Sequence, residues 1–354
     1  MFLGNRYCHG VPARGEVGCF WKEDFMAEYY VVTDLGTLPG GASSTAYDIN
    51  DLGQVVGSSD AAGGQVHAFL WTPATQMQDL GTLPGGSGSA GSGINVCGLV
   101  AGQSDLAGSG GKTHAFVWTN GGGKQDLGTL AGDNESDASA INACGQVAGN
   151  SILTAGGKLH AFIWSRAGGM TNLGVLPGFT DSGTHDINNL GQVVGYCSAA
   201  NVANRGFLWS GAAGMKPVGT LPGGVGSDAV GINDLGEIVG TSDSGDASKP
   251  HAVLWNRAGV ARDFGTLPGG TSSTAFAINN LGVVVGNGNC TGAGSHAFVW
   301  SANSGMKDLN ALIPANSGWE LVNAVAINVA GQIVGVGTVN AQQHAFLLTP
   351  QCTP

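Results

Sequence analysis

Residues 34–41 read DLGTLPGG, and the same eight letters return at 79–86. Close variants follow at 126–133 (DLGTLAGD), 172–179 (NLGVLPGF), 218–224 (VGTLPGG) and 263–270 (DFGTLPGG). A segment that recurs at a nearly constant interval indicates a repeat architecture, in which one unit and its copies decide the fold.

Three further elements recur with it in constant order: a small-residue segment ending in Ile-Asn, a GQVVG-like segment and a HAFLW-like segment. Each is short and rich in Val, Ile, Phe and Trp, which is typical of strands. Asn-x-x-Gly between the first two predicts a tight hairpin, with Asn tolerating the left-handed conformation and Gly supplying a positive φ. Pro-Gly-Gly after DLGTL ends the strand and starts a new sheet. The seven Asn lie 45 to 49 residues apart, at 50, 95, 142, 188, 233, 279 and 328.

One unit is therefore a four-stranded antiparallel meander, which cannot bury both of its faces alone. The sequence predicts an all-β fold, a seven-bladed β-propeller of four-stranded antiparallel blades. The Ile-Asn segment carries Ser, Ala or Gly at alternate positions, so we expect it innermost, where the blades converge, with DLGTL outermost. The last unit lacks a DLG segment and a spare one stands at 34–38, so an N-terminal strand should close the ring.

The propeller is expected to span residues 26–354 as a single domain. Residues 1–25 are interpreted as an N-terminal extension, a remnant of an upstream repeat, because GCFW at 18–21 resembles the HAFLW element. No run of 18 apolar residues predicts a membrane span. The N-terminus has no hydrophobic core of a signal peptide.

The formal net charge of −11 over 354 residues argues against nucleic-acid partners, which need a basic surface. It is compatible with cations or neutral ligands.

Seven Cys without a Cys-x-x-Cys spacing argue against a zinc site. Cys97 and Cys144 occupy the same position in successive repeats and are interpreted as small buried residues, with a bridge between units as the alternative.

The motifs DLGTLPGG, IN-x-x-GQVVG and HAFLW resemble those of the HAF-repeat family over roughly residues 30–350. That family is regarded as extracellular and bacterial, so the resemblance implies a secreted or cell-surface protein. It carries no agreed catalytic residues. We expect a monomer.

The repeated aromatic and imidazole side chains are interpreted as structural. Six Trp in register should pack between blades, the alternative being a platform that stacks on sugars. Six His in register should be hydrogen-bonded anchors, the alternative being ligands. The Trp are 71, 118, 164, 209, 255 and 300, and the His are 67, 114, 160, 251, 296 and 344, with Arg205 in the remaining unit.

Acidic residues are expected to gather at the mouth of the ring that receives the connections into each innermost strand. Asp133, Glu135 and Asp137 alternate along the chain, as in loops that bind hard cations, and Asp181 and Asp228 lie in neighbouring connections. These five are the candidate ligands of a Ca²⁺ ion, which takes six to eight oxygens. The spacing is not that of an EF-hand, and a solvated acidic loop is the alternative.

Two innermost segments depart from the small-residue rule, at Tyr47-Asp48 and at His185-Asp186. Adjacent strand residues face opposite ways, so we expect that His185 and Asp186 do not share one surface. His185, Asp186 and Asp48 are candidate general bases or ion ligands at the central channel. The alternative is a buried polar pair that satisfies local backbone groups.

Two functions follow. The first is an extracellular binding module that holds a glycan, peptide, small molecule or protein at its loop-rich mouth. The second is a calcium-dependent hydrolase of lactones or esters with the metal in the central funnel, an analogy with other propellers. The chain has no nucleophile-elbow, phosphate-loop or zincin motif, and no nucleotide or organic cofactor is expected.

Overall fold

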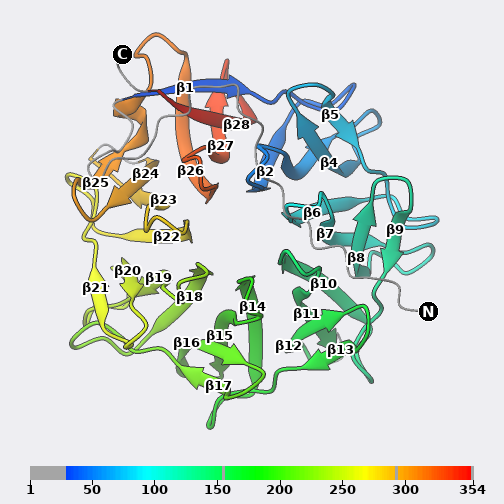
Figure 1. Ribbon diagram of the computed structural model, residues 1–354, viewed down its shortest axis with the longest axis horizontal. Coiled ribbons are helices and arrows are strands. Elements are labelled where there is room, and N and C mark those ends of the chain that lie inside the picture. Colours follow the sequence, from blue (N-terminus) through cyan, green and yellow to red (C-terminus); the bar gives the residue numbers. More distant parts are fainter. Residues whose placement is uncertain (1–28, 154–155, 292–293, 352–354) are drawn as a thin grey trace, which may run out of the picture.

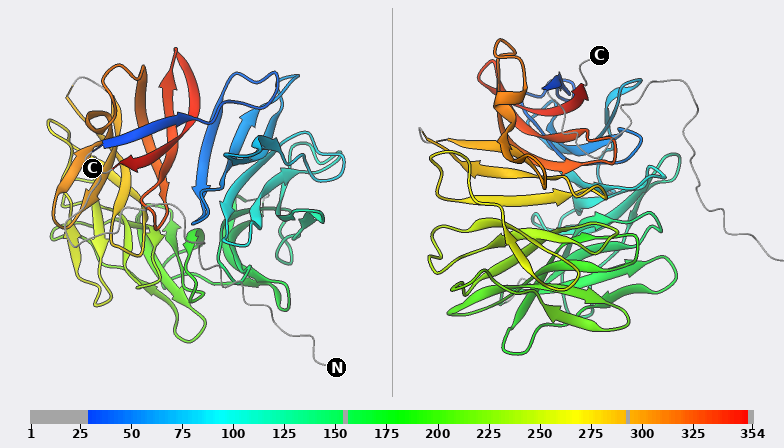
Figure 2. Two further views of the ribbon diagram at one scale, coloured as in Figure 1. Left: turned by 45° about the horizontal axis from the view of Figure 1, so that its top comes forward. Right: turned by 60° about the vertical axis from the view of Figure 1, so that its left-hand side comes forward.

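The computed structural model describes residues 29–153, 156–291 and 294–351, which form 28 strands and one 3-10 helix, η1 (Leu309–Leu312). The strands make seven four-stranded sheets around a central axis (Figure 1). The predicted seven-bladed β-propeller is confirmed, and the views in Figure 2 show the blades side by side around the ring. The proposed extension at residues 1–25 lies outside the described residues.

Four strand positions repeat from the axis outward, and every neighbouring pair is antiparallel. The innermost strands are β2 (Ser44–Ile49), β6 (Ser89–Ile94), β10 (Glu135–Ile141), β14 (Asp181–Ile187), β18 (Ser227–Ile232), β22 (Ser273–Ile278) and β26 (Trp319–Ile327). The second are β3 (Val55–Asp60), β7 (Val100–Asp105), β11 (Val147–Leu153), β15 (Val193–Ala199), β19 (Ile238–Ser242), β23 (Val284–Asn289) and β27 (Ile333–Val339). The third are β4 (Val66–Thr72), β8 (Thr113–Thr119), β12 (Lys158–Ser165), β16 (Val202–Ser210), β20 (His251–Trp255), β24 (Ser295–Ser301) and β28 (Gln342–Gln351). The outermost are β5 (Gln76–Asp79), β9 (Gly123–Asp126), β13 (Gly169–Asn172), β17 (Gly214–Pro217), β21 (Ala261–Asp263), β25 (Gly305–Asp308) and β1 (Tyr29–Asp34).

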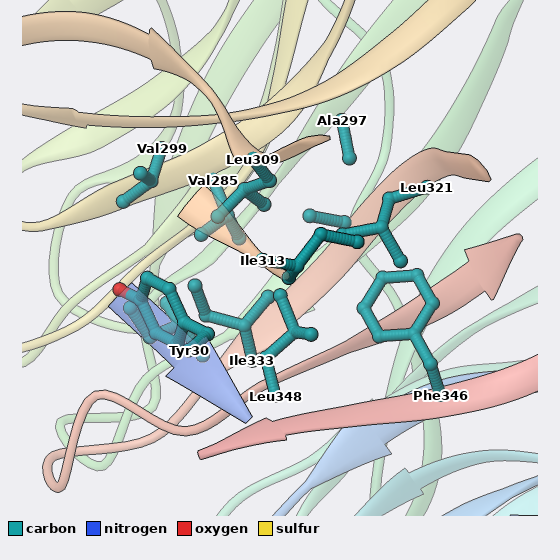
Figure 3. Packing of buried hydrophobic residues seen from close by; sticks show 12 residues of the cluster. Tyr30, Val285, Ala297, Val299, Leu309, Ile313, Leu321, Ile333, Phe346 and Leu348 are labelled. Carbon is teal, nitrogen blue, oxygen red and sulfur yellow. The ribbon is translucent and has the colours of Figure 1, made fainter. Parts of the chain in front are cut away.

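Blades are numbered 1 to 7 from the one that begins at β2, and the N-terminal strand closes blade 7. β1 pairs antiparallel with β28, from Tyr29 opposite Gln351 to Asp34 opposite Phe346 (Figure 1). Figure 3 shows the ring of Tyr30 in the same apolar cluster as Ile333. The predicted closure is confirmed, and it gives the last sheet its fourth strand, so that β28 is paired on both sides.

The DLGTL segment is not an outermost strand, which corrects the expectation above. Each outer strand ends at the first residue of the motif, and in five of the seven blades the Gly two residues later takes a positive φ, as Gly36 does at 71°. The rest of the motif connects blades. The N–H of Leu38 donates to Ser59 Oγ at 2.9 Å, Ser44 Oγ donates to the carbonyl of Gly36, and the Leu38 side chain is buried.

A ring of seven Asn side chains joins the blades around the axis. Each Asn Nδ2 donates to the backbone carbonyl of the Asn in the next blade at 3.0 to 3.2 Å, and Asn328 closes the circle onto Asn50. Asn50 Oδ1 also accepts from the N–H groups of Leu52 and Gln54, which fixes its own turn. The positive φ predicted for this turn falls on Gly53 and not on the Asn. We call this end of the ring the Asn mouth and the opposite end the loop mouth.

Cys97 and Cys144 are exposed, so their interpretation as buried residues is wrong. Both are the third residue of an Asn-x-x-Gly turn, and these turns face solvent at the Asn mouth. The equivalent Leu52 and Leu190 are also exposed.

The six His side chains that occupy the same position in their repeats are hydrogen-bonded anchors, as predicted. Five of them pair through Nδ1 with the Asp that ends the outer strand of the same blade: His67–Asp79, His114–Asp126, His251–Asp263, His296–Asp308 and His344–Asp34. In blade 3, where Asn172 replaces that Asp, His160 pairs with Asp133 instead. Blade 4 has neither partner, because Arg205 and Pro217 stand at the two positions.

The hydrophobic core lies between the blades. Trp164 of blade 3, for example, is 8% exposed and packs in one cluster with Ala101 and Val117 of blade 2. Trp71, Trp118, Trp255 and Trp300 are buried in equivalent clusters, and Trp209 is partly buried. The Trp side chains therefore pack between blades, as the sequence predicts.

Replacing Trp164 by Ala should lower the free energy of unfolding by roughly 3–5 kcal/mol, because a large aromatic site in the core is emptied. Urea denaturation measures this, with the exposed Leu190→Ala as a control that should change it by less than about 0.5 kcal/mol. An unchanged stability would show that the ring is not a packing element.

Candidate functional site

Seven side chains that break the repeat line the central channel. Each innermost strand has a register shift in its pairing with the second strand, a β-bulge that turns one extra residue out of the regular alternation. All seven bulge residues line one cavity of about 470 Å³. They are Tyr47, Ser92, Ser139 and His185 in blades 1 to 4, and Val230, Phe276 and Val325 in blades 5 to 7. The channel wall is therefore polar on one side and apolar on the other.

The bulge also overturns the expectation that His185 and Asp186 face different surfaces. Both line the cavity, and so do Tyr47 and Asp48, because the extra residue interrupts the alternation at this point. Asp137, expected in the loops of the mouth, lines the same cavity.

Asp48 and Asp186 occupy equivalent positions and each joins two blades. Asp48 accepts from the N–H groups of Ile49 and, in the next blade, Ile94, both at 2.8 Å. Asp186 accepts in the same way from Ile187 and Ile232. The alternative reading, that an acidic residue here satisfies local backbone groups, holds for both carboxylates, which nonetheless remain part of the channel wall.

Burial shifts the titration of the channel carboxyl groups upward. Burial raises the pKa of Asp48 to about 7 and that of Asp137 to about 6. Burial also raises the pKa of Asp186. Carboxyl groups of this kind can exchange a proton with a bound molecule or accept a hydrogen bond from it.

His185 faces a carboxylate of the next blade. Its Nε2 lies 3.2 Å from Asp228 Oδ1, with the imidazole 5.5 Å from the ring of Tyr196, centre to centre. Both atoms are buried, and their alignment is too poor for a hydrogen bond, so neither has a hydrogen-bond partner among the described residues. This pair is a buried polar contact beside the channel wall that no hydrogen bond satisfies.

The five candidate calcium ligands are held in separate interactions. Asp133 pairs with His160, Asp137 accepts from Asn150 Nδ2, and Asp228 faces His185. Asp181 accepts from the N–H of Leu159 and from Thr180 Oγ1, while Glu135 lies on β10 opposite Ile152. Within the described parts of the chain, no three or more His, Cys, Asp or Glu side chains form a group that could hold a metal ion. The calcium site stays a prediction.

Sequence reasoning missed five of the seven bulge residues. The signal that could have found them is one aligned position of the repeat, the second residue before the Ile of each Ile-Asn pair. It varies between Tyr, Ser, His, Val and Phe, whereas the position before it is a small residue, Ala or Gly, in all units but one. A position that varies within otherwise uniform repeats is one that the scaffold does not require.

No family model and no curated protein matches the chain. Solved structures similar to it include the β-propeller domain of the Trilobed protease from Pyrococcus furiosus, at 9% identity and a TM-score of 0.59 over 92% of this chain and 95% of that one. Virginiamycin B lyase from Staphylococcus aureus is 10% identical, with a TM-score of 0.54 over 90% and 99%. A puromycin hydrolase is 13% identical, with a TM-score of 0.56 over 87% of this chain and 52% of that one. Likeness at such identity concerns the fold alone.

No helix in the described residues is long and apolar enough to cross a membrane.

The melting temperature, measured in about 1 mM Ca²⁺ and in EDTA, tests the calcium prediction. A cation held by Asp133, Glu135 and Asp137 binds only the folded state, so Ca²⁺ should raise Tm. The Asp133→Asn, Asp137→Asn double variant should lose that rise, and Asp246→Asn, an exposed acidic residue elsewhere, should keep it. Identical melting curves of the wild type in Ca²⁺ and EDTA would exclude the site.

Proposed function

We propose that this protein is a binding module that takes a ligand into the central channel from the loop mouth. The observation that supports this most is the contrast between scaffold and channel. The Asn ring, the His–Asp pairs and the buried Trp repeat around the propeller, whereas the bulge residues that line the cavity do not. Side chains that differ from blade to blade serve recognition better than they serve the ring.

The chemistry of the wall selects a ligand with one polar and one apolar side. Ser92, Ser139 and His185 offer hydroxyl and imidazole groups, and Phe276 faces the channel from the opposite arc. A sugar presents hydroxyl groups at its edge and C–H groups on its face, and the latter suit an aromatic ring. A peptide side chain can meet the same requirements. The cavity of about 470 Å³ lies within the range of pockets for small ligands, roughly 300–1,000 Å³.

We infer an extracellular or cell-surface location in bacteria from the resemblance to HAF-repeat proteins. The support is the seven copies of the motif set and the match of their number to the seven blades. Detection of the protein outside the cytoplasm of its source would test this inference.

A calcium-dependent hydrolase of lactones or esters is the second candidate function. The observation that favours it is the set of ionisable groups in the channel, where Asp48 has a pKa of about 7 and His185 lies next to Asp228. Such groups are suited to proton transfer. Turnover of 4-nitrophenyl acetate or a simple lactone, abolished by EDTA and by Asp48→Asn, would establish this activity, and no turnover would exclude it for these substrates.

Ser92→Trp should abolish binding in the channel without unfolding the ring, because the indole fills the cavity from a position with no interblade role. Wild-type protein is first screened on glycan and peptide arrays, and the hits are titrated against the variant by calorimetry. We expect at least a tenfold loss of affinity at an unchanged Tm. Thr171→Trp, which introduces the same side chain on the exposed outermost strand β13, is the matched control.

Equal affinity of Ser92→Trp and the wild type would place the ligand elsewhere. Arrays without any hit would contradict a glycan or peptide ligand.

A further inference from the structure

Blade 4 departs from the repeat at several positions that meet in one place on the outer rim. Arg205 stands where six blades have His, and Pro217 where five have Asp and one Asn. Phe179 replaces the last Gly of the LPGG connection, and Val218 replaces the Leu or Phe that follows the outer strand. Arg205 and Pro217 lie in blade 4 itself, while Phe179 and Val218 lie in the connections that enter and leave it. Four departures that meet at one place in a regular ring indicate a local requirement and not a requirement of the fold.

These four residues line a single cavity of about 570 Å³, together with Leu176, Pro177 and Gly219. We call it the rim pocket. It shares no lining residue with the channel cavity, which is built from inner strands. Except for Arg205, its walls are apolar, and they include the aromatic ring of Phe179 and the rings of Pro177 and Pro217.

A fifth departure is coupled to the pocket. Position 206 is Gly in blade 4 and Ala in the other six blades. A Cβ atom at Gly206 would lie 2.7 Å from Val218 Cγ2, which is too close for both side chains to stay in place. The same Cβ would lie 2.9 Å from the backbone nitrogen of Ala229 in blade 5. Gly206 therefore permits both Val218 in the pocket wall and the close approach of blade 5 behind it.

Arg205 provides the charge of the rim pocket. Its Nη2 donates to the carbonyl of Val225 at 3.0 Å, and among the described residues it forms no ion pair with a carboxylate. Asp243, which lies by the same loop, accepts from the N–H groups of Val225 and Gly226. A guanidinium has five N–H donors in a planar fork that matches a carboxylate. Arg205 thus keeps donors for an anion at the edge of an apolar cavity.

We propose that the rim pocket of blade 4 is a second binding site, for a small organic acid with an apolar body. The hydrocarbon part would lie against Pro177, Phe179 and Val218, and the carboxylate would meet Arg205. Charge complementarity selects an anion here, in a protein whose net charge of −11 gives anions no general attraction. The site is independent of the proposed channel function.

Calorimetric titration of the full chain with 3-phenylpropionate and with its neutral counterpart 3-phenylpropan-1-ol tests the proposal. We expect the acid to bind at least about tenfold more tightly than the alcohol, since only the acid can form charge-assisted hydrogen bonds. Arg205→Gln should remove this difference and leave the alcohol unchanged. Arg262→Gln, at an arginine of blade 5, is the matched control and should bind as the wild type does.

A second variant keeps the test decisive if a single change disturbs the pocket. Phe179→Gly, Arg205→His, Pro217→Asp gives blade 4 the residues of the other blades, so it should fold with an unchanged or higher Tm and bind neither probe. No binding of the acid to the wild type, or equal binding by wild type and Arg205→Gln, would overturn the proposal. Preference for the peptide acetyl-Gly-Phe with a free C-terminal carboxylate over 3-phenylpropionate would also overturn it, in favour of a protein terminus as the occupant.

Discussion

The ring of hydrogen bonds between asparagine side chains is the interaction on which the rest of the propeller depends. Each amide performs two tasks at once, since its oxygen holds the N–H groups of its own turn and its nitrogen reaches the backbone of the next blade. The last bond joins Asn328 to Asn50 across 278 residues, so the ring closes only when all seven blades are present. Buried amides satisfied in this way fix the distance between neighbouring blades at the Asn mouth.

Once the ring is held at repeated positions, the remaining positions are free to differ. The β-bulge supplies such a position in each blade, because the extra residue lies outside the ladder and points into the channel. Five residue types at the seven copies of this position produce a channel with a polar and an apolar side. The rim pocket of blade 4 follows the same principle on the outside, where the His–Asp pair is given up and Arg205 and Pro217 take its place. Recognition is thus placed where the repeat is broken.

The sequence predicted the fold well because the repeat carries it: blade number, inner strand and closure by residues near 30–38 follow from counting equal elements. It failed where backbone conformation departs from ideal strands. DLGTL has the composition of a strand, yet Gly36 takes a positive φ and the segment becomes a hydrogen-bonded connection. The strict alternation of strand residues predicted that His185 and Asp186 face opposite sides. A β-bulge, which the local residue types do not reveal, places both on the channel surface. Cys97 and Cys144 were placed inside from their polarity, although the turn that holds them faces solvent.

The most direct test of this account compares a ring position with a channel position in the same fold. Urea denaturation would measure the free energy of unfolding of Asn142→Asp, which removes the donor to Asn188 and sets a carboxylate against a carbonyl, and of Ser92→Ala at a bulge. The account predicts a loss of about 1–3 kcal/mol or more for Asn142→Asp, the cost of a buried hydrogen bond left unmade. It predicts a change within about 0.5 kcal/mol for Ser92→Ala. Equal stabilities of Asn142→Asp and the wild type would contradict the claim that the asparagine ring holds the blades together.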